Sequence, residues 1–96
     1  MKISKAAIRR IVKSVTLTGL TPNIGPEALE LLQVEVEKSD CDPETYAREI
    51  AEKVAVMAAW AGRKTIRPID VTNFNMVSDD RIQERKNRQA QRDGVI

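Results

Sequence analysis

An all-α fold is predicted for this chain, with a short helix, a long helix and a second short helix in that order, followed by a C-terminal helical extension. Three segments repeat apolar residues at intervals of three and four, which places their side chains on one face of a helix. No segment alternates apolar and polar residues in the manner of a half-buried strand. The 96 residues are therefore expected to form one small helical domain and its extension.

The first helix is expected over residues 4–14, with an apolar face at helical spacing: Ile8, Ile11, Val12 and Val15. Ser4 is a suitable N-cap, because its hydroxyl can accept a hydrogen bond from a backbone N–H of the first turn. Residues 16–25 are rich in threonine and glycine and contain a proline, so we expect a loop there.

The long helix is expected from Pro26 to Ala61. Its second half carries apolar residues at helical spacing: Tyr46, Ile50, Val54, Met57 and Ala61. Within residues 39–45, Asp42 and Pro43 have the character of an N-cap and the first residue of a fresh helix. Because a proline in a helix interior costs about 3 kcal/mol, we expect a kink or a break there rather than a straight rod.

A tight basic turn joins the long helix to the third one. Gly62 stands where the end of a helix favours a residue that tolerates positive φ, and Pro68 stands where a new helix begins. The residues between them include two adjacent cations, a hydroxyl and an isoleucine: Arg63, Lys64, Thr65 and Ile66. This exposed positive charge suits a phosphate. Thr65 and Ile66 are the one pair expected to be extended, and Asp70 is spaced to pair with Arg63.

The net charge of +2 is distributed unevenly along the chain. Residues 1–25 carry five cations and no acid, and residues 62–67 carry three more cations. Residues 26–61, which lie between them, carry nine acids and three cations. If the fold brings the two basic segments to one edge, that edge is a footprint for nucleic acid. The alternative is a helical protein whose charges are simply solvated, and the charge pattern alone does not decide between them.

Enzymatic activity is not expected. The chain has no histidine, which is the commonest general base and transition-metal ligand. It also lacks a glycine-rich phosphate loop and a cluster of metal ligands. We therefore expect no catalytic residues, no metal, no cofactor and no small-molecule substrate.

The compartment is expected to be intracellular. Cys41 is the only cysteine, so no internal disulfide can form, and its acidic neighbours do not favour a reactive thiolate. The first residues lack the apolar stretch of a signal peptide. No run is long and apolar enough to span a bilayer, so no membrane partner is expected.

The run Gly62-Arg63-Lys64-Thr65-Ile66, followed by Asp70 and Val71, resembles the second loop and third helix of the archaeal histones. The resemblance covers roughly residues 3–77 and implies a histone-fold domain over residues 1–77, built as an intertwined dimer. A long helix between two short ones leaves a broad apolar face open in a single chain. We therefore expect an obligate homodimer with little stable monomer.

The resemblance also implies binding to double-stranded DNA on the chromosome in the cytoplasm, mainly through phosphates and with little sequence preference. The residues that match the family's contacts are Arg10 and Lys13 of the first helix and Arg63, Lys64 and Thr65 of the second loop. Lys5 and Arg9 are neighbouring cations. In the family, the pair matched by Arg63 and Asp70 holds the loop to the third helix, so Arg63 is expected to be partly structural and Lys64 the better phosphate contact.

Two departures from the family bear on assembly and DNA contact. Trp60 stands where many archaeal histones have a histidine that joins dimers end to end, and an indole N–H only donates. Trp60 is then either a core residue or the anchor of a different interface. The loop before the long helix is longer than the family's, with Asn23 in place of the usual cation.

The second unit, residues 78–96, is a C-terminal helical extension that begins with a helix-capping pattern at Ser78. It is either a basic tail that adds phosphate contacts or a seam that joins dimers. We favour the seam, which would produce tetramers that bridge two duplexes. The residues expected at such a dimer–dimer interface are Trp60, Met76, Val77 and Ile82. The alternative function is a histone-fold subunit of a transcription-regulatory complex that acts through a protein partner.

Overall fold

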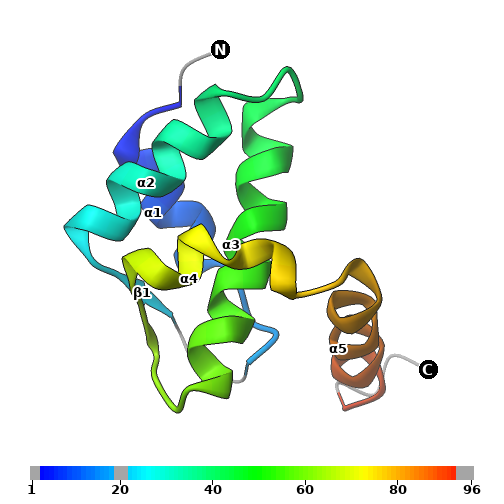
Figure 1. Ribbon diagram of the computed structural model, residues 1–96. Coiled ribbons are helices and arrows are strands. Elements are labelled where there is room, and N and C mark those ends of the chain that lie inside the picture. The colour runs from blue at the N-terminus through cyan, green and yellow to red at the C-terminus, as the bar shows by residue number, and fades with distance from the viewer. Residues whose placement is uncertain (1–2, 19–21, 93–96) are drawn as a thin grey trace.

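The computed structural model describes residues 3–18 and 22–92 of the chain. The elements follow one another as α1 (Lys5–Lys13), β1 (Asn23–Ile24), α2 (Pro26–Glu37), α3 (Pro43–Trp60), β2 (Thr65–Ile66), α4 (Pro68–Thr72), η1 (Phe74–Met76, a 3₁₀ turn) and α5 (Asp79–Arg92). The described chain is mostly helical, which confirms the all-α class (Figure 1). None of its helices combines the length and the apolar character that crossing a bilayer requires.

Helix α1 begins as expected. The Ser4 hydroxyl accepts a hydrogen bond from the backbone N–H of Ala7 at 3.1 Å, which caps the first turn. The apolar face of α1 is buried, with Ile8 and Val12 fully removed from solvent. The cations of the helix lie on its exposed side.

The expected long helix is two helices, which corrects the short–long–short order and confirms the break. Helix α2 ends at Glu37 and α3 begins at Pro43. The Asp42 carboxylate accepts hydrogen bonds from the backbone N–H of Thr45 at 3.0 Å and from its hydroxyl at 2.9 Å. Both hydrogen bonds lower the pKa of Asp42 below its ordinary value, and the one from the Thr45 backbone N–H has the larger effect. A side-chain cap followed by proline at the first helical position starts a new helix rather than continuing the old one.

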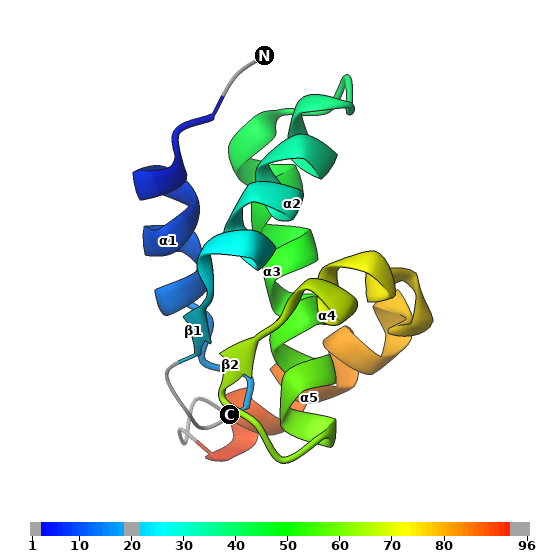
Figure 2. The ribbon, with the colours of Figure 1, turned by 60° about the vertical axis from the view of Figure 1, so that its left-hand side comes forward.

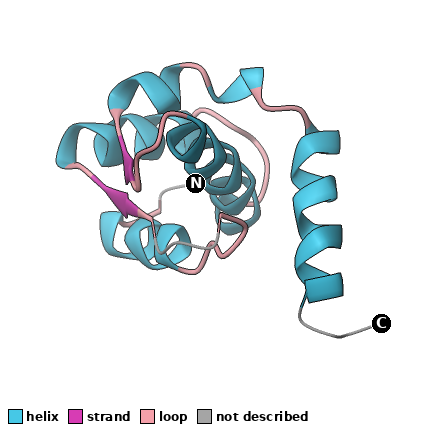
Figure 3. Cartoon of the chain, turned by 90° about the horizontal axis from the view of Figure 1, so that it is seen from below, coloured by secondary structure: helices cyan, strands magenta, loops and turns pink. Residues whose placement is uncertain are grey.

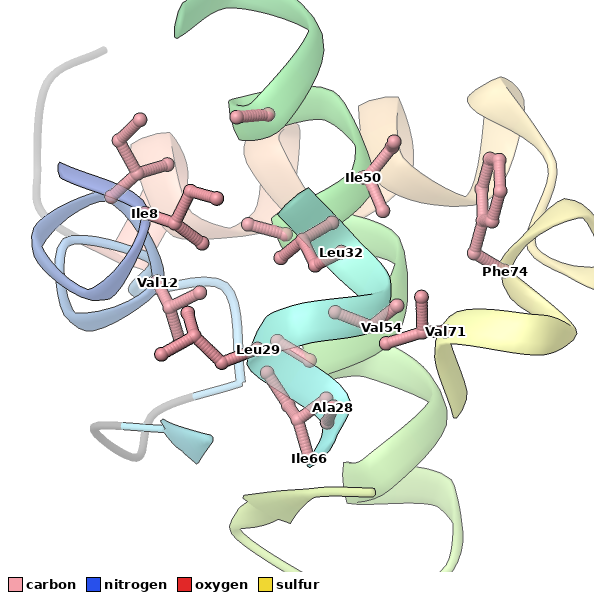
Figure 4. Packing of buried hydrophobic residues seen from close by; sticks show 14 of the residues in the cluster. Ile8, Val12, Ala28, Leu29, Leu32, Ile50, Val54, Ile66, Val71 and Phe74 are labelled. Carbon is pink, nitrogen blue, oxygen red and sulfur yellow. The ribbon is translucent and has the colours of Figure 1, made fainter. Parts of the chain in front are cut away.

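The two helices fold back on each other. Helices α2 and α3 lie side by side and run in opposite directions, joined by the turn at residues 38–42 (Figure 2). Leu32 of α2, Ile50 and Val54 of α3 and Ile8 of α1 meet in one core and are fully buried (Figure 4). The premise that a single chain leaves a broad apolar face open is therefore wrong, because the chain covers that face itself. The obligate dimer stays a prediction, but an open apolar face on the single chain no longer supports it.

Two short strands join distant parts of the chain. Strands β1 and β2 pair in parallel, with Asn23 opposite Thr65 and Ile24 opposite Ile66. The backbone N–H of Asn23 donates to the Lys64 carbonyl at 2.9 Å. The extended conformation of Thr65 and Ile66 was expected, whereas β1 was not, because two residues are too few to show an alternating pattern.

Helix α5 stands to one side of the other helices (Figure 3) and contacts α3 through side chains. Its Ile82 side chain is buried with Val56 and Val77 in a small second cluster. Two ion pairs bring the helix to α3: Lys53 Nζ lies 2.9 Å from Asp79 Oδ1, and Lys86 Nζ lies 3.3 Å from Glu52 Oε2. The extension therefore packs onto its own chain in this structure.

Candidate nucleic-acid interface

The second loop begins where α3 ends. Gly62 has a φ of +73°, the one positive value among the described residues. Glycine adopts this conformation without strain because it has no Cβ. The backbone N–H of Arg63 then turns back to donate to the Ala58 carbonyl at 2.9 Å. These contacts end the helix and direct residues 63–66 across to β1.

The predicted pair between Arg63 and Asp70 is present. Arg63 Nη1 and Nη2 donate to the two carboxylate oxygens of Asp70 at 3.0 and 3.1 Å. Arg63 Nη1 also donates to the Thr65 carbonyl, and the backbone N–H of Arg67 donates to Asp70 Oδ2 at 2.8 Å. Hydrogen bonding to Asp70, which is almost completely buried, raises the pKa of Arg63 above its ordinary value. The guanidinium is thus engaged in holding the loop, and Lys64 is the more available cation.

Strand pairing sets the two loops side by side. Lys64 and Thr65 are exposed, and β2 holds them next to Asn23, which is also exposed. The C-terminal half of α1 leads to the same region, since α1 contacts β1 (Figure 2). Arg10 and Lys13 lie in the last turn of α1, and both are exposed. The fold therefore gathers four of the predicted residues around one strand pair.

The remaining predicted cations of α1 are placed differently. Lys5 is the first residue of the helix, about 12 Å from Lys13 along the axis at 1.5 Å per residue. It lies toward the end of the molecule at which the chain begins (Figure 2). Arg9 is exposed midway between them. Lys5 is thus separated from the second loop, while Arg9 is intermediate.

Four exposed acids lie at the opposite end of the molecule from the strand pair. The turn between α2 and α3 carries Asp40 and Asp42, and Glu37 and Glu44 flank it; all four are exposed. This turn and the β1–β2 pair lie at different ends of the α2–α3 hairpin (Figures 1 and 2). These four acids are thus distant from the strand pair, whereas Glu27 and Glu30 of α2 lie near Pro68, which follows β2.

Arg48 of α3 was not identified from the sequence. Its Nη1 donates to the Ser14 hydroxyl at 2.9 Å, next to the end of α1. The two helices border an open hollow of about 220 Å³ that Arg10, Arg48 and Glu44 help to line. In the sequence Arg48 is surrounded by acids, so only the packing of α3 against α1 could have revealed it.

The four residues predicted for a dimer–dimer interface do not form one exposed surface. Val77 and Ile82 are buried within their own chain, at 1% and 7% exposure. Trp60 and Met76 are exposed, at 53% and 75%. A seam built on Val77 and Ile82 is therefore wrong for this arrangement, because the cluster with Val56 already uses both side chains. Trp60 is not a core residue.

Exposed guanidinium, ammonium and hydroxyl groups are groups that can bind phosphate oxygens. Among the described residues, no three His, Cys, Asp or Glu side chains gather in a group that could hold a metal ion. Comparison of the chain with protein-family models, curated proteins and solved structures gives no match. The candidate interface therefore rests on the sequence and on the geometry described above.

Proposed function

We propose that this protein binds double-stranded DNA through the phosphate backbone, largely without sequence preference, as a histone-like protein of the chromosome. The observation that carries the proposal is the β1–β2 pair. It places Lys64 and Thr65 beside the end of α1 that bears Arg10 and Lys13. Exposed cations from two distant segments thus lie around one strand pair and form one basic edge. Contacts of this kind give affinity and position but carry no base readout.

A single folded chain carries the whole basic edge. Both loops and α1 come from the same molecule, and the β1–β2 pair joins them within it. Binding of one duplex by one chain is therefore part of the proposal. The paired loops support a histone-like arrangement, in which the expected long helix is replaced by two helices that fold back on each other.

The double variant Lys13→Ala/Lys64→Ala tests the basic edge. We expect its affinity for a duplex to fall by about tenfold or more at low salt, because two phosphate contacts are lost. The slope of log affinity against log salt should become shallower by about 2. Fluorescence anisotropy with a labelled duplex measures both quantities.

A matched control removes the same charge elsewhere. Lys38→Ala/Arg81→Ala also deletes two exposed cations, neither of them in α1 or in the strand pair. The control should bind far more tightly than the edge variant at every salt concentration. Equal loss of affinity in the two double variants would show that only net charge matters, and the basic edge would then be the wrong site.

A second candidate function is that of a subunit acting through a protein partner. Leu31 and Val34 of α2 are exposed at 41% and 44% and line a hollow of about 330 Å³ together with Val71 and Phe74. Ile69, on neighbouring α4, is 61% exposed. Apolar surface of this kind favours contact with another protein. Negligible DNA binding by the wild-type protein at low salt would favour this function over the first.

A further inference from the structure

We infer that α5 carries a second phosphate-binding site, formed by Arg85 and Arg88 beside the loop that follows α1. The inference rests on the proposed DNA binding, since a nucleic-acid phosphate is the ligand, and it adds two residues from a part of the chain outside the basic edge. Three features support it: how α5 is held, what surrounds the two arginines, and how close they lie to α1.

Helix α5 is held in a fixed orientation on the body. The residues that contact the body recur at intervals of three and four along the helix, as one helical face requires: Asp79, Ile82, Lys86 and Gln89. Gln89 Nε2 donates to the Thr16 hydroxyl at 2.6 Å, which ties the second half of α5 to the loop after α1. The Lys86 ammonium group is engaged in an ion pair with Glu52. The neighbouring arginines are therefore placed by the packing of the helix.

Arg85 and Arg88 border a small open hollow. Its volume is about 170 Å³, and Leu17, Thr18 and Gln89 complete the lining. Arg85 Nη1 donates to the Leu17 carbonyl at 3.4 Å, a long bond that directs the guanidinium toward the loop. No carboxylate is among these lining residues. A guanidinium presents five N–H donors in a planar fork that matches phosphate oxygens.

The acid nearest to this site in the sequence holds Arg88 only loosely. Arg88 Nη2 lies 3.8 Å from Glu84 Oε2, beyond hydrogen-bonding distance, and the two side chains are 74% and 57% exposed. Exposed ion pairs one helical turn apart stabilise a helix only weakly. A phosphate can therefore compete with Glu84 for this guanidinium at little cost.

The hollow is close to the basic edge. Leu17 follows Lys13 by four positions, so their Cα atoms lie within about 14 Å of each other even if the chain between them is fully extended. Double-stranded DNA carries one negative charge per ~1.7 Å of its axis. A duplex that contacts Lys13 thus presents several further phosphates within about 14 Å, the longest distance from Lys13 to Leu17 at the border of the hollow. Of the two expected roles of the C-terminal extension, this arrangement favours a basic segment that adds phosphate contacts over a segment that joins two dimers.

The test compares Arg85→Ala/Arg88→Ala with Arg81→Ala/Lys38→Ala, which removes the same charge from exposed positions outside the hollow. We expect the hollow variant to bind a duplex about tenfold more weakly at low salt, with a salt slope shallower by 1 to 2, and the control to stay within about twofold of the wild type. A charge-preserving variant, Arg85→Lys/Arg88→Lys, should recover most of the lost affinity and the slope.

The outcomes separate this inference from the proposed function. If Lys13→Ala/Lys64→Ala weakens binding while Arg85→Ala/Arg88→Ala binds as the wild type does, the basic edge stands and the α5 site is wrong. If the lysine variant binds no better than the alanine variant, the loss comes from disturbed packing of α5 rather than from missing charge, which also overturns the site. A wild-type protein that binds no duplex at low salt overturns both.

Discussion

The substitutions Asp42→Ala and Pro43→Ala together are expected to shift the protein strongly from single chains toward dimers that exchange helices. The break between α2 and α3 is stabilised by the Asp42 cap and by Pro43 at the first helical position. A cap contributes about 1 kcal/mol, and a proline in a continuous helix costs about 3 kcal/mol. Without them, α2 and α3 can join into one long helix, and a second chain supplies the packing that the turn now provides within the chain.

Because each dimer contains two such turns, the two substitutions should raise the dimerisation constant by several powers of ten. Sedimentation velocity over a range of concentrations measures this directly. The control Pro26→Ala/Asp40→Ala removes one proline and one aspartate from places where neither caps α3. An unchanged mass distribution in the Asp42/Pro43 variant would contradict the role of the break.

Replacing Asp70 by alanine is expected to lower the free energy of unfolding by about 3 kcal/mol. The Asp70 carboxylate is 3% exposed and accepts hydrogen bonds from Arg63 and from the backbone N–H of Arg67. Its loss leaves a guanidinium and a backbone donor without their acceptor. The Arg63 side chain is 22% exposed and can partly turn to water, so the expected cost lies at the low end for a broken buried pair.

Urea denaturation measures this effect, with Asp80→Ala as the control for removing an exposed aspartate. Asp70→Asn keeps an oxygen acceptor but loses the charge, so its free energy of unfolding should lie between those of Asp70→Ala and Asp80→Ala. The account of the loop would be contradicted if Asp70→Ala stayed within about 0.5 kcal/mol of the wild type, since that is the range of an ordinary surface substitution. The same variant should also weaken DNA binding, because Lys64 and Thr65 lose their fixed position.

Local features of the fold could be predicted from the sequence. The Ser4 cap, the break at Asp42 and Pro43, and the positive φ of Gly62 each depend on a residue and its immediate neighbours. The pair of Arg63 with Asp70 spans only seven residues and belongs to one turn. Features that depend on residues so close together in the sequence can be recognised from the sequence alone.

Features that depend on distant contacts could not be predicted. Asn23 gives no sign in the sequence that it pairs with a strand at Thr65. The bonds from α5 to the loop after α1 join residues 68 and 73 positions apart, so no local pattern encodes them. The closure of α2 onto α3 was missed for the same reason. A break in the helix was expected, but the direction of the chain after it depends on how the whole core packs.

The most direct test of DNA binding is the affinity of the wild-type protein for two duplexes of unrelated sequence between about 50 and 200 mM salt. Five cations are assigned to phosphates: Arg10, Lys13, Lys64, Arg85 and Arg88. Log affinity should therefore fall linearly with log salt at a slope of about −4 to −5, alike for both duplexes. Absence of binding at the lowest salt, or a shallow slope with strong preference for one duplex, would contradict phosphate-directed binding by this protein.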